Sequence, residues 1–591
     1  MNYNYYKLPF TNNRKKYASY NKRGTFKDAR CPKSKAETSS VPLESYRSKV
    51  KLFSSRCLLR KTGCTTAKIS KYHILESKNT GRDICRNILD TDIGLGGCYR
   101  NINLDSVIPA LSPILESFKI RHNRFNYLDK LKYMTENGHG KRTQKYKNQI
   151  DICLLQSFFS LLLYRNVPLE LFGTLRNRKA IKKTICRLLK TVPGKMSIER
   201  AFKRNVGKTK IVTGASLDLQ PLFNKLDISS IRWLHSIDNG TVRWIVVLKL
   251  LHWFFAQYII KILHKYVVLK VIQKKWVYIT KDNWCNMQEE FIREKENTLS
   301  LVPYTGLPST MRNFGTYKFI PSSSGVRALF LARYNVKEKY DDTDVVLRFL
   351  QQLYITYFNN NGIPTIASCR KAIWNFKNSR PKKQLYFVLC DIQDAFGSII
   401  QQKLYDIIIT CCKQKLGKYL AVRTFILSKP KRSQRKNTVQ ILCNKLRKRI
   451  SKNAIPSGEK PKLVQTKKLI DKIYKLIFHQ KVKLNDQIYS IKLGVPQGAW
   501  VSPILSDIYY QYMSKEIFSE YAHNSLLCRY VDDIIYITEN EHYAAKFLEI
   551  IRNGVPEYNT RFNPNKIKTN VGMPYDVPTK ITFLKRISLT I

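Results

Sequence analysis

Acidic residues are scarce in this chain of 591 residues. Lys and Arg total 104 against 42 Asp and Glu, which gives a formal net charge of +62 at pH 7. Such an excess of positive charge favours a polyanionic partner. Polyphosphate backbones are the natural candidates, with an affinity that depends on salt through counterion release. An anionic membrane surface is the alternative, and it fits less well because the basic residues are spread along the whole chain and interleaved with aromatic residues.

Three other common patterns are missing. None of the 14 cysteines forms a C-x-x-C pair with zinc-like spacing, which predicts reduced thiols in an intracellular protein. The N-terminus carries no apolar signal region. The most apolar stretch, residues 244–272, is interrupted by Lys249, Lys261 and Lys265, so we expect a buried helix or helix pair in place of a membrane span. A hydrophobic content of 43% is nevertheless enough for cores in several domains.

Two adjacent acids mark the most informative stretch. Residues 526–538 place Asp532 and Asp533 between two apolar, β-rich runs, a pattern typical of a tight hairpin with the acids at its tip. Neighbouring carboxylates cost free energy unless a cation neutralises them, and Mg²⁺ prefers such oxygen ligands. Taken alone, the stretch is equally consistent with an exposed Asp-Asp turn.

Two further stretches favour the first interpretation. Residues 386–391 form another apolar run that predicts a strand and ends on Asp391. Residues 493–503 form a Gly/Pro-rich loop containing Pro-Gln-Gly and lead into an apolar run that we expect to be helical. A strand ending on Asp, then Pro-Gln-Gly, then Tyr-x-Asp-Asp, in this order, resembles motifs A, B and C of reverse transcriptases.

The acids predict a two-metal site. Asp391, Asp532 and Asp533 would hold two Mg²⁺ ions about 4 Å apart, one activating a 3′ hydroxyl and the other stabilising the leaving group. The predicted metal set also includes Ile392, the residue that follows Asp391. Strand alternation turns Asp394 away from the face of Asp391, so we expect Asp394 to be structural.

Other residues are candidates for the incoming nucleotide. Phe396 is expected to lie against the sugar and to exclude a 2′ hydroxyl, and Gln497 to line the nucleotide pocket. Arg327 is a candidate for the triphosphate because guanidinium binds phosphate bidentately, with a solvated arginine as the alternative. Lys566 is a candidate to protonate the leaving pyrophosphate.

Features outside motifs A, B and C extend the resemblance. Residues 166–178, with Gln156 upstream, resemble the QFP motif of the telomerase RNA-binding domain, and residues 276–284 resemble its T motif. A basic insertion between motifs A and B is similar to the family's insertion in the fingers domain, and residues 554–566 resemble the approach to motif D. From about residue 150 onward, the chain thus resembles telomerase reverse transcriptase.

The resemblance implies the roles already given to the acids, Phe396 and Gln497. It adds Lys318, which with Arg327 falls on the basic positions of motifs 1 and 2. Ser322 stands where the family usually has a second basic residue, so Lys318 is the candidate to substitute for it. Two departures from the family are expected. No N-terminal domain of longer family members is recognisable before about residue 80, and no helical thumb is recognisable after the palm, so either the chain is a fragment or the protein is divergent. Residues 581–585 resemble a degenerate primer grip without the usual Trp-Cys-Gly.

We therefore expect a multidomain right-hand polymerase, with an all-α RNA-binding domain followed by α+β reverse-transcriptase fingers and palm. The expected divisions, in chain order, are a basic, flexible arm (1–78), the helical RNA-binding domain (79–300), fingers with motifs 1 and 2 (301–384), a palm with motifs A to D (385–575) carrying a basic insertion at about 402–486, and a remnant of the primer grip (576–591). The basic run at 13–16 predicts either a nuclear import signal or a solvated charge run.

The resemblance implies an RNA-directed DNA polymerase that copies a bound RNA and adds telomeric repeats to chromosome 3′ ends. Its expected partners are the telomerase template RNA, a telomeric single-stranded DNA primer and dNTPs, without a membrane, in the nucleus at chromosome ends. The alternatives are a retroelement-type reverse transcriptase and an inactive RNA-binding scaffold.

Overall fold

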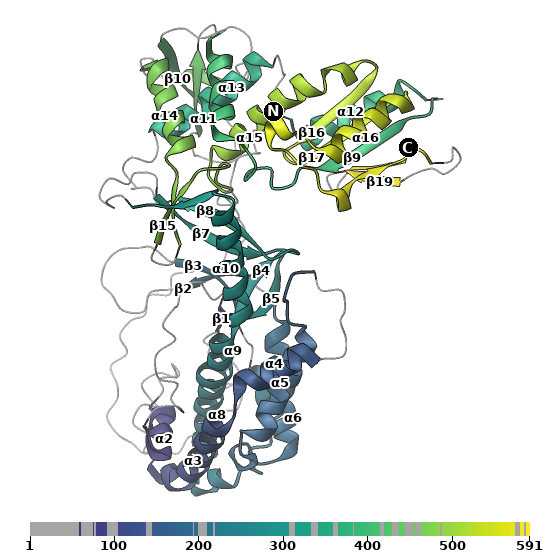
Figure 1. The fold of residues 1–591 in the computed structure, drawn as a ribbon. Helices are drawn as coiled ribbons and strands as arrows, with labels where there is room; N and C mark the ends of the chain where they lie inside the picture. Colours follow the sequence, from purple (N-terminus) through teal and green to yellow (C-terminus); the bar gives the residue numbers. More distant parts are fainter. Residues whose placement is uncertain are drawn as a thin grey trace. The chain divides into compact units, whose positions relative to one another are not determined.

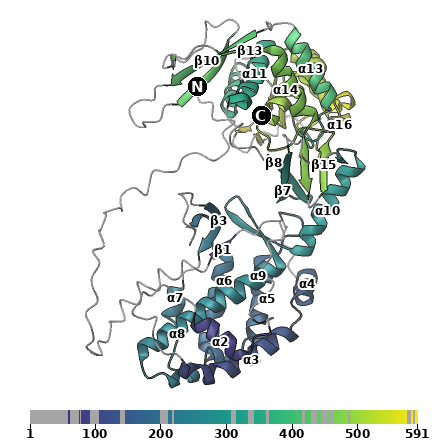
Figure 2. The same cartoon turned by 90° about the vertical axis from the view of Figure 1, so that its left-hand side faces the viewer.

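The computed structural model describes residues 58–60, 75, 78–90, 105–137, 145–192, 194–198, 210–216, 219–305, 314–332, 341–358, 364–381, 383–413, 419–427, 437–443, 454–456, 462–484, 487–573, 580–583 and 587–590. Most of the predicted basic arm, including the run at 13–16, lies outside these residues, as do parts of the predicted insertion and primer grip. The described chain forms two compact units (Figures 1 and 2). The helical unit comprises the described residues up to Phe291 together with Phe319–Arg327. The second unit, which we call the polymerase unit after the expected fingers and palm, comprises Ile292–Lys318 and the described residues from Ala328 onward. The predicted domain boundaries stay predictions.

The helical unit is built mainly of α-helices. They are α2 (Gly81–Leu89), α3 (Ile108–Arg124), α4 (Tyr127–Asn137), α5 (Ile152–Arg165), α6 (Leu175–Lys190), α7 (Gln220–Phe223), α8 (Gly240–Trp253), α9 (Ile260–Tyr266) and α10 (Lys281–Asn297), the last spanning the division between the units. Two small sheets accompany them, one with the strand order β1-β3-β2 (Leu58–Arg60, Lys210–Ser216, Gly194–Ile198) and a hairpin of β4 (Val267–Ile272) and β5 (Lys275–Thr280). The expected helical domain is thus confirmed, and its strands add to the all-α arrangement that the sequence predicts.

Helices α5 and α6 lie within the predicted helical domain. Each begins at a polar cap, since the Asp151 carboxylate accepts a hydrogen bond from the Cys153 amide at 2.8 Å and the Thr174 hydroxyl accepts one from the Asn177 amide. Gly173 separates the helices with φ of +82°, and a Cβ there would lie 2.6 Å from the Ser230 carbonyl oxygen. Only glycine fits this turn, which places α6 antiparallel to its predecessor.

The most apolar stretch forms one long helix. Val242–Tyr266 runs through α8, a π-helical turn at Phe254–Ile259 and α9. It is the one helix in the described residues that is long and apolar enough to cross a membrane, and 72% of its most apolar window is buried inside the protein. This matches the expected buried helix. The last residues of the predicted stretch instead form β4, because an apolar run alone does not distinguish a helix from a buried strand.

The polymerase unit contains two four- or five-stranded sheets in addition to the central sheet that carries the acids. The first has the order β6-β15-β14-β7-β8, from Leu301–Pro303, Gln487–Ile491, Lys481–Leu484, Phe314–Pro321 and Val326–Ala332. The second pairs β10 (Tyr419–Leu427) with β11 (Asn437–Cys443), β12 (Ala454–Pro456) and β13 (Lys462–Gln465). Strands β7 and β8 follow each other in the chain and are neighbours in this sheet.

The central sheet of the polymerase unit has the order β16-β17-β9-β18, from Ser525–Tyr530, Asp533–Thr538, Tyr386–Asp391 and Lys568–Thr569. The helices of this unit are α11 (Asp341–Tyr357), α12 (Ile366–Asn378), α13 (Gln401–Lys413), α14 (Thr466–Phe478), α15 (Ser502–Ile517) and α16 (Glu541–Asn553), and a separate hairpin joins β19 (Lys580–Phe583) to β20 (Ile587–Thr590). The sheet is held by a core in which Val388, Ile534, Ile508 and Phe547 are all buried. This core fixes the strand ends that carry the predicted acids.

Candidate active site

The three predicted acids meet at one end of the central sheet. Strand β9 ends on Asp391, and β17 begins on Asp533, which is paired with Asp391 in the antiparallel register. Asp532 lies in the turn of the β16–β17 hairpin, and its carbonyl accepts a hydrogen bond from the Ile392 amide at 2.8 Å. The predicted hairpin and strand are confirmed, and the backbone brings all three acids to one place.

Lys566 also contacts this place from 175 residues away. Its ammonium nitrogen lies 2.7 Å from Oδ2 of Asp391. The contact is positioned by the preceding Asn563, whose amide donates to the Asp391 carbonyl at 2.9 Å and whose side chain caps the 3₁₀ turn Pro564–Lys566. The Lys566 side chain is 51% exposed, whereas that of Asp391 is 12% exposed, so the lysine covers the acid from the solvent side.

The donor chemistry suits a hard divalent cation. Carboxylate oxygens are the ligands that Mg²⁺ prefers, and the backbone segments of three acidic residues meet here. As the side chains are arranged, no group of three or more metal-ligating side chains in the described residues surrounds a single point, and the cation beside Asp391 is the Lys566 ammonium. Ile392 has a buried apolar side chain, so only its backbone carbonyl offers a donor. Burial and the neighbouring carboxylates of Asp391 and Asp533 raise the pKa of the Cys390 thiol, which stays protonated.

The turn after Asp391 presents Phe396. Asp394 adopts φ of +48°, its carbonyl accepts from the Gly397 amide at 2.8 Å, and its carboxylate lies 2.8 Å from the Lys295 ammonium. This is the structural role expected of Asp394. The Phe396 side chain is half-buried and packs against the edge of the core, which leaves part of its ring accessible.

The Pro-Gln-Gly loop packs directly on that turn. The Val495 amide donates to the Phe396 carbonyl at 2.8 Å, and a Cβ on Gly494 would lie 2.6 Å from the same oxygen. The Gln497 carbonyl accepts a hydrogen bond from the Phe330 amide of β8 at 2.7 Å. The loop is therefore fixed on both sides, and α15 follows it as predicted.

The remaining predicted residues lie on the β7–β8 strands. Lys318 on β7 and Arg327 on β8 are both exposed. Among the described residues, neither side chain forms a hydrogen bond or ion pair that would indicate its role. Their role toward the triphosphate stays a prediction.

The sequence motifs do not identify Arg529, a buried arginine three residues before Asp532. A charged residue inside an otherwise apolar strand was the signal that could have identified it.

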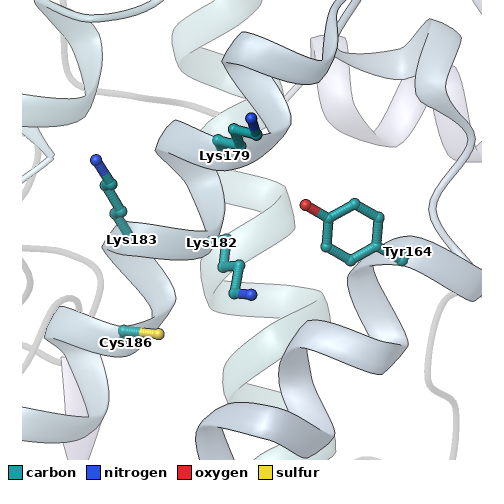
Figure 3. Close-up of a pocket in the computed structure, with 5 residues that line it drawn as sticks. All are labelled: Tyr164, Lys179, Lys182, Lys183 and Cys186. Atoms are coloured by element: carbon teal, nitrogen blue, oxygen red, sulfur yellow. The ribbon is translucent and has the colours of Figure 1, made fainter.

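The helical unit has a basic pocket of its own (Figure 3). A cavity of about 380 Å³ is lined by Tyr164 of α5 and by Lys179, Lys182, Lys183 and Cys186 of α6. The Tyr164 ring is 42% exposed, and the Lys182 ammonium lies 5.9 Å from its centroid. Within the described part of the chain, none of the three lysines forms an ion pair with an acid. Their charge is therefore available to an external anion.

Comparisons with known proteins agree with this architecture. Residues 452–584 match the model of the family described as reverse transcriptase (RNA-dependent DNA polymerase). Telomerase reverse transcriptase of Rattus norvegicus is 23% identical over 470 residues, covering 70% of this chain and 41% of its own length, and that of Mus musculus is 21% identical over 497 residues, covering 72% and 43%. The chain thus spans about two-fifths of the length of these curated relatives.

Solved structures show the same fold. Apo telomerase from Candida tropicalis, truncated from its C-terminal domain, superposes with a TM-score of 0.57 at 17% identity, covering 90% of this chain and 97% of the solved one. Telomerase from Candida albicans, solved in complex with the TWJ fragment of telomeric RNA, gives 0.56 at 17% identity, covering 86% and 77%. By sequence and by fold, the chain is similar to the telomerase reverse transcriptases, and residues 452–584 match the reverse transcriptase family.

Proposed function

We propose that this chain is the RNA-directed DNA polymerase of a telomerase, which copies a bound template RNA to add telomeric repeats to chromosome 3′ ends. The observation that carries the proposal is the register of β9 and β17, which sets Asp391 opposite Asp533 with Asp532 in the adjoining turn. The substrates are dNTPs and a telomeric single-stranded DNA primer. The site of action is the nucleus, at chromosome ends.

The acids are proposed to bind the metal ions of the reaction. The reverse transcriptase family uses divalent metal ions, and two Mg²⁺ held by Asp391, Asp532, Asp533 and the Ile392 carbonyl would activate the primer 3′ hydroxyl and stabilise the leaving pyrophosphate. The Lys566 ammonium, which contacts Asp391 at 2.7 Å, would lie beside the leaving group if Asp391 held a metal ion. Its Nζ can then donate a proton to the departing pyrophosphate oxygen.

The other residues bind and select the nucleotide. Phe396 excludes a ribose 2′ hydroxyl by its ring, and Gln497 lies in the loop that packs on the Phe396 turn. Lys318 and Arg327 neutralise the triphosphate, Arg327 through its planar pair of donors. The lysines of α6, which pair with none of the described acids, hold the RNA at the helical unit, which keeps the template attached to the polymerase.

Asp532→Asn tests the proposal, because it removes a ligand charge while changing almost no volume. Incorporation of labelled dNTP on an RNA template should fall by orders of magnitude, with RNA binding preserved, since electrostatic stabilisation is a dominant part of phosphoryl-type catalysis. Asp406→Asn is the matched control, since Asp406 is an exposed acid of α13 in the same unit, and it should leave the rate unchanged. Near-normal synthesis by folded Asp532→Asn protein would contradict the assignment.

Sequencing of the RNA that copurifies with the chain separates the two polymerase alternatives. A short template complementary to a telomeric repeat supports the telomerase proposal, whereas the chain's own messenger or an element transcript supports a retroelement enzyme. Synthesis by the wild-type chain on any template contradicts the inactive scaffold.

A further inference from the structure

Arg529 is a buried cation directly behind the acidic turn. It lies on β16 with a side chain 3% exposed, three residues before Asp532. One terminal nitrogen donates to Oδ1 of Asp507 at 3.0 Å and the other to the Asp507 carbonyl at 3.2 Å. Burial alone would lower the pKa of Arg529, but the charge and hydrogen bond of Asp507, together with Tyr354 and Tyr510, raise it above its ordinary value. The guanidinium is therefore a fixed, charged donor.

The same guanidinium reaches into the turn. The nitrogen that donates to the Asp507 carboxylate also lies 3.1 Å from the Val531 carbonyl oxygen. Asp507 belongs to α15, the helix that follows the Pro-Gln-Gly loop. Through Arg529, the acidic turn is thus tied to the helix behind it by three hydrogen bonds.

The turn needs such a tie because its backbone is strained. Tyr530 pairs with Asp533, so Val531 and Asp532 are the two central residues of the hairpin, and Val531 adopts φ of +56°. Glycine is the usual residue at a first central position with positive φ, and a β-branched residue there is a conformational outlier that carries strain. A strained turn persists only where surrounding contacts hold it.

We propose that Arg529 is a positioning residue: by holding the Val531 carbonyl from inside the polymerase unit, it fixes the strained turn and thereby the directions of the Asp532 and Asp533 carboxylates. The inference rests on the proposed polymerase function for its kinetic consequence. Its structural part, that Arg529 sets the geometry of a cation site, stands without catalysis.

The competing explanation is that Arg529 and Asp507 merely form a core ion pair. These two explanations predict different behaviour when both charges are removed. A buried ion pair replaced by apolar residues of similar volume often leaves stability unchanged or improved, whereas removing one partner leaves a buried charge uncompensated. The double variant Arg529→Met/Asp507→Leu therefore keeps the packing and removes the bond to Val531.

The experiment compares full-length wild type, the double variant and Arg529→Lys in three measurements: thermal unfolding, Tb³⁺ affinity by tyrosine-sensitised luminescence, and single-nucleotide addition. The double variant should unfold within a few degrees of wild type. Its half-saturating Tb³⁺ concentration should rise roughly ten- to a hundredfold, as for loss of outer-shell support of ligands. Its addition rate should fall on the order of a hundredfold, since about 1 Å of misplacement has that effect.

Arg529→Lys keeps a charge opposite Asp507 and is expected to lose the bond to the Val531 carbonyl, so it should be folded and show the same weakening of Tb³⁺ binding. Arg380→Met is the matched control, because Arg380 pairs with Glu539 in the same unit and makes no contact with the turn. It should keep wild-type Tb³⁺ affinity.

Wild-type Tb³⁺ affinity and addition rate in a folded double variant or in Arg529→Lys would overturn the positioning role. If the wild type binds Tb³⁺ and Arg529 variants weaken it while no chain extends a primer, the proposed polymerase function fails and the positioning role stands. If the wild type binds no Tb³⁺ at all, both are wrong.

Discussion

Basic side chains near the three acids form ion pairs, whereas those around the pocket of α5 and α6 pair with no described acid. Near the acids, the structure pairs the cations, with Lys566 on Asp391, Lys295 on Asp394 and Arg529 on Asp507. On the α6 face, Lys179, Lys182 and Lys183 line a pocket beside an exposed tyrosine, and no described acid pairs with them.

This difference separates geometry from affinity. Paired and buried charges fix side-chain positions, since breaking such a pair leaves an uncompensated charge. Unpaired surface lysines fix no geometry and contribute to binding a polyanion in a salt-dependent way. We therefore expect the acidic site to select nucleotides by shape and the α6 face to bind RNA by charge. Three measurements test this difference.

The largest effect is expected at Phe396. Phe396→Ala opens space beside the sugar and should let ribonucleotides enter. The ratio of deoxy to ribo incorporation, each as kcat/KM, should fall on the order of a hundredfold, the equivalent of about 3 kcal/mol of lost steric exclusion. The ratio should be the same at low and high salt, because the substitution changes no charged residue.

Phe358→Ala is the matched control, since Phe358 is another half-buried phenylalanine packed on the same core. It should keep the wild-type ratio even if the protein is destabilised. A Phe396→Ala chain with an unchanged ratio would assign Phe396 to packing and not to sugar selection.

A smaller effect is expected on the α6 face. The triple substitution of Lys179, Lys182 and Lys183 by glutamine should weaken RNA binding by roughly ten- to a hundredfold at 0.15 M salt, because each phosphate contact contributes about 0.7–0.9 to the slope of log affinity against log salt. The measurement is RNA affinity at several salt concentrations. Primer extension at saturating RNA should be unchanged.

The control for net charge replaces three exposed lysines of α14, Lys467, Lys468 and Lys475, by glutamine. Equal weakening by both triple variants would mean that total charge, and not the pocket beside Tyr164, determines RNA affinity.

The smallest effect concerns a paired charge at the surface. Hydrogen bonds from Lys383 and then Arg380 hold the pKa of Glu539 below its ordinary value of 4.5. A depressed carboxyl pKa contributes stability above the unfolded-state value, and this contribution is lost as the pH falls through the folded-state pKa. Glu539→Gln should therefore lower Tm slightly at pH 7, by no more than a few degrees, and the difference should vanish at acid pH. A difference that persists below pH 3 would point to packing.

The acidic hairpin, the strand that ends on Asp391 and the helix after the Pro-Gln-Gly loop could all be predicted, because each is encoded in a local pattern of apolar residues and turn formers. The pairing of Lys566 with Asp391 and of the Gln497 carbonyl with Phe330 could not, because these contacts join segments 175 and 167 residues apart and leave no local periodicity. Strands β2 and β3 were missed for a similar reason, since short strands in a helical context carry too few alternating residues. The sequence shows Arg529 as a charged residue in an apolar strand, but it does not show that Asp507 is its partner.

The register between β9 and β17 has a genetic consequence. Because strand side chains alternate with a period of two, a one-residue slip of β9 would move every core residue of the strand to the opposite face and withdraw Asp391 from Asp533. Strand β9 is paired along its whole length by β17 and, at Val388 and Leu389, by β18 on its other side. Loss or gain of a single codon within residues 386–391 should therefore abolish both folding and synthesis, whereas substitution of one apolar residue by another is tolerated there.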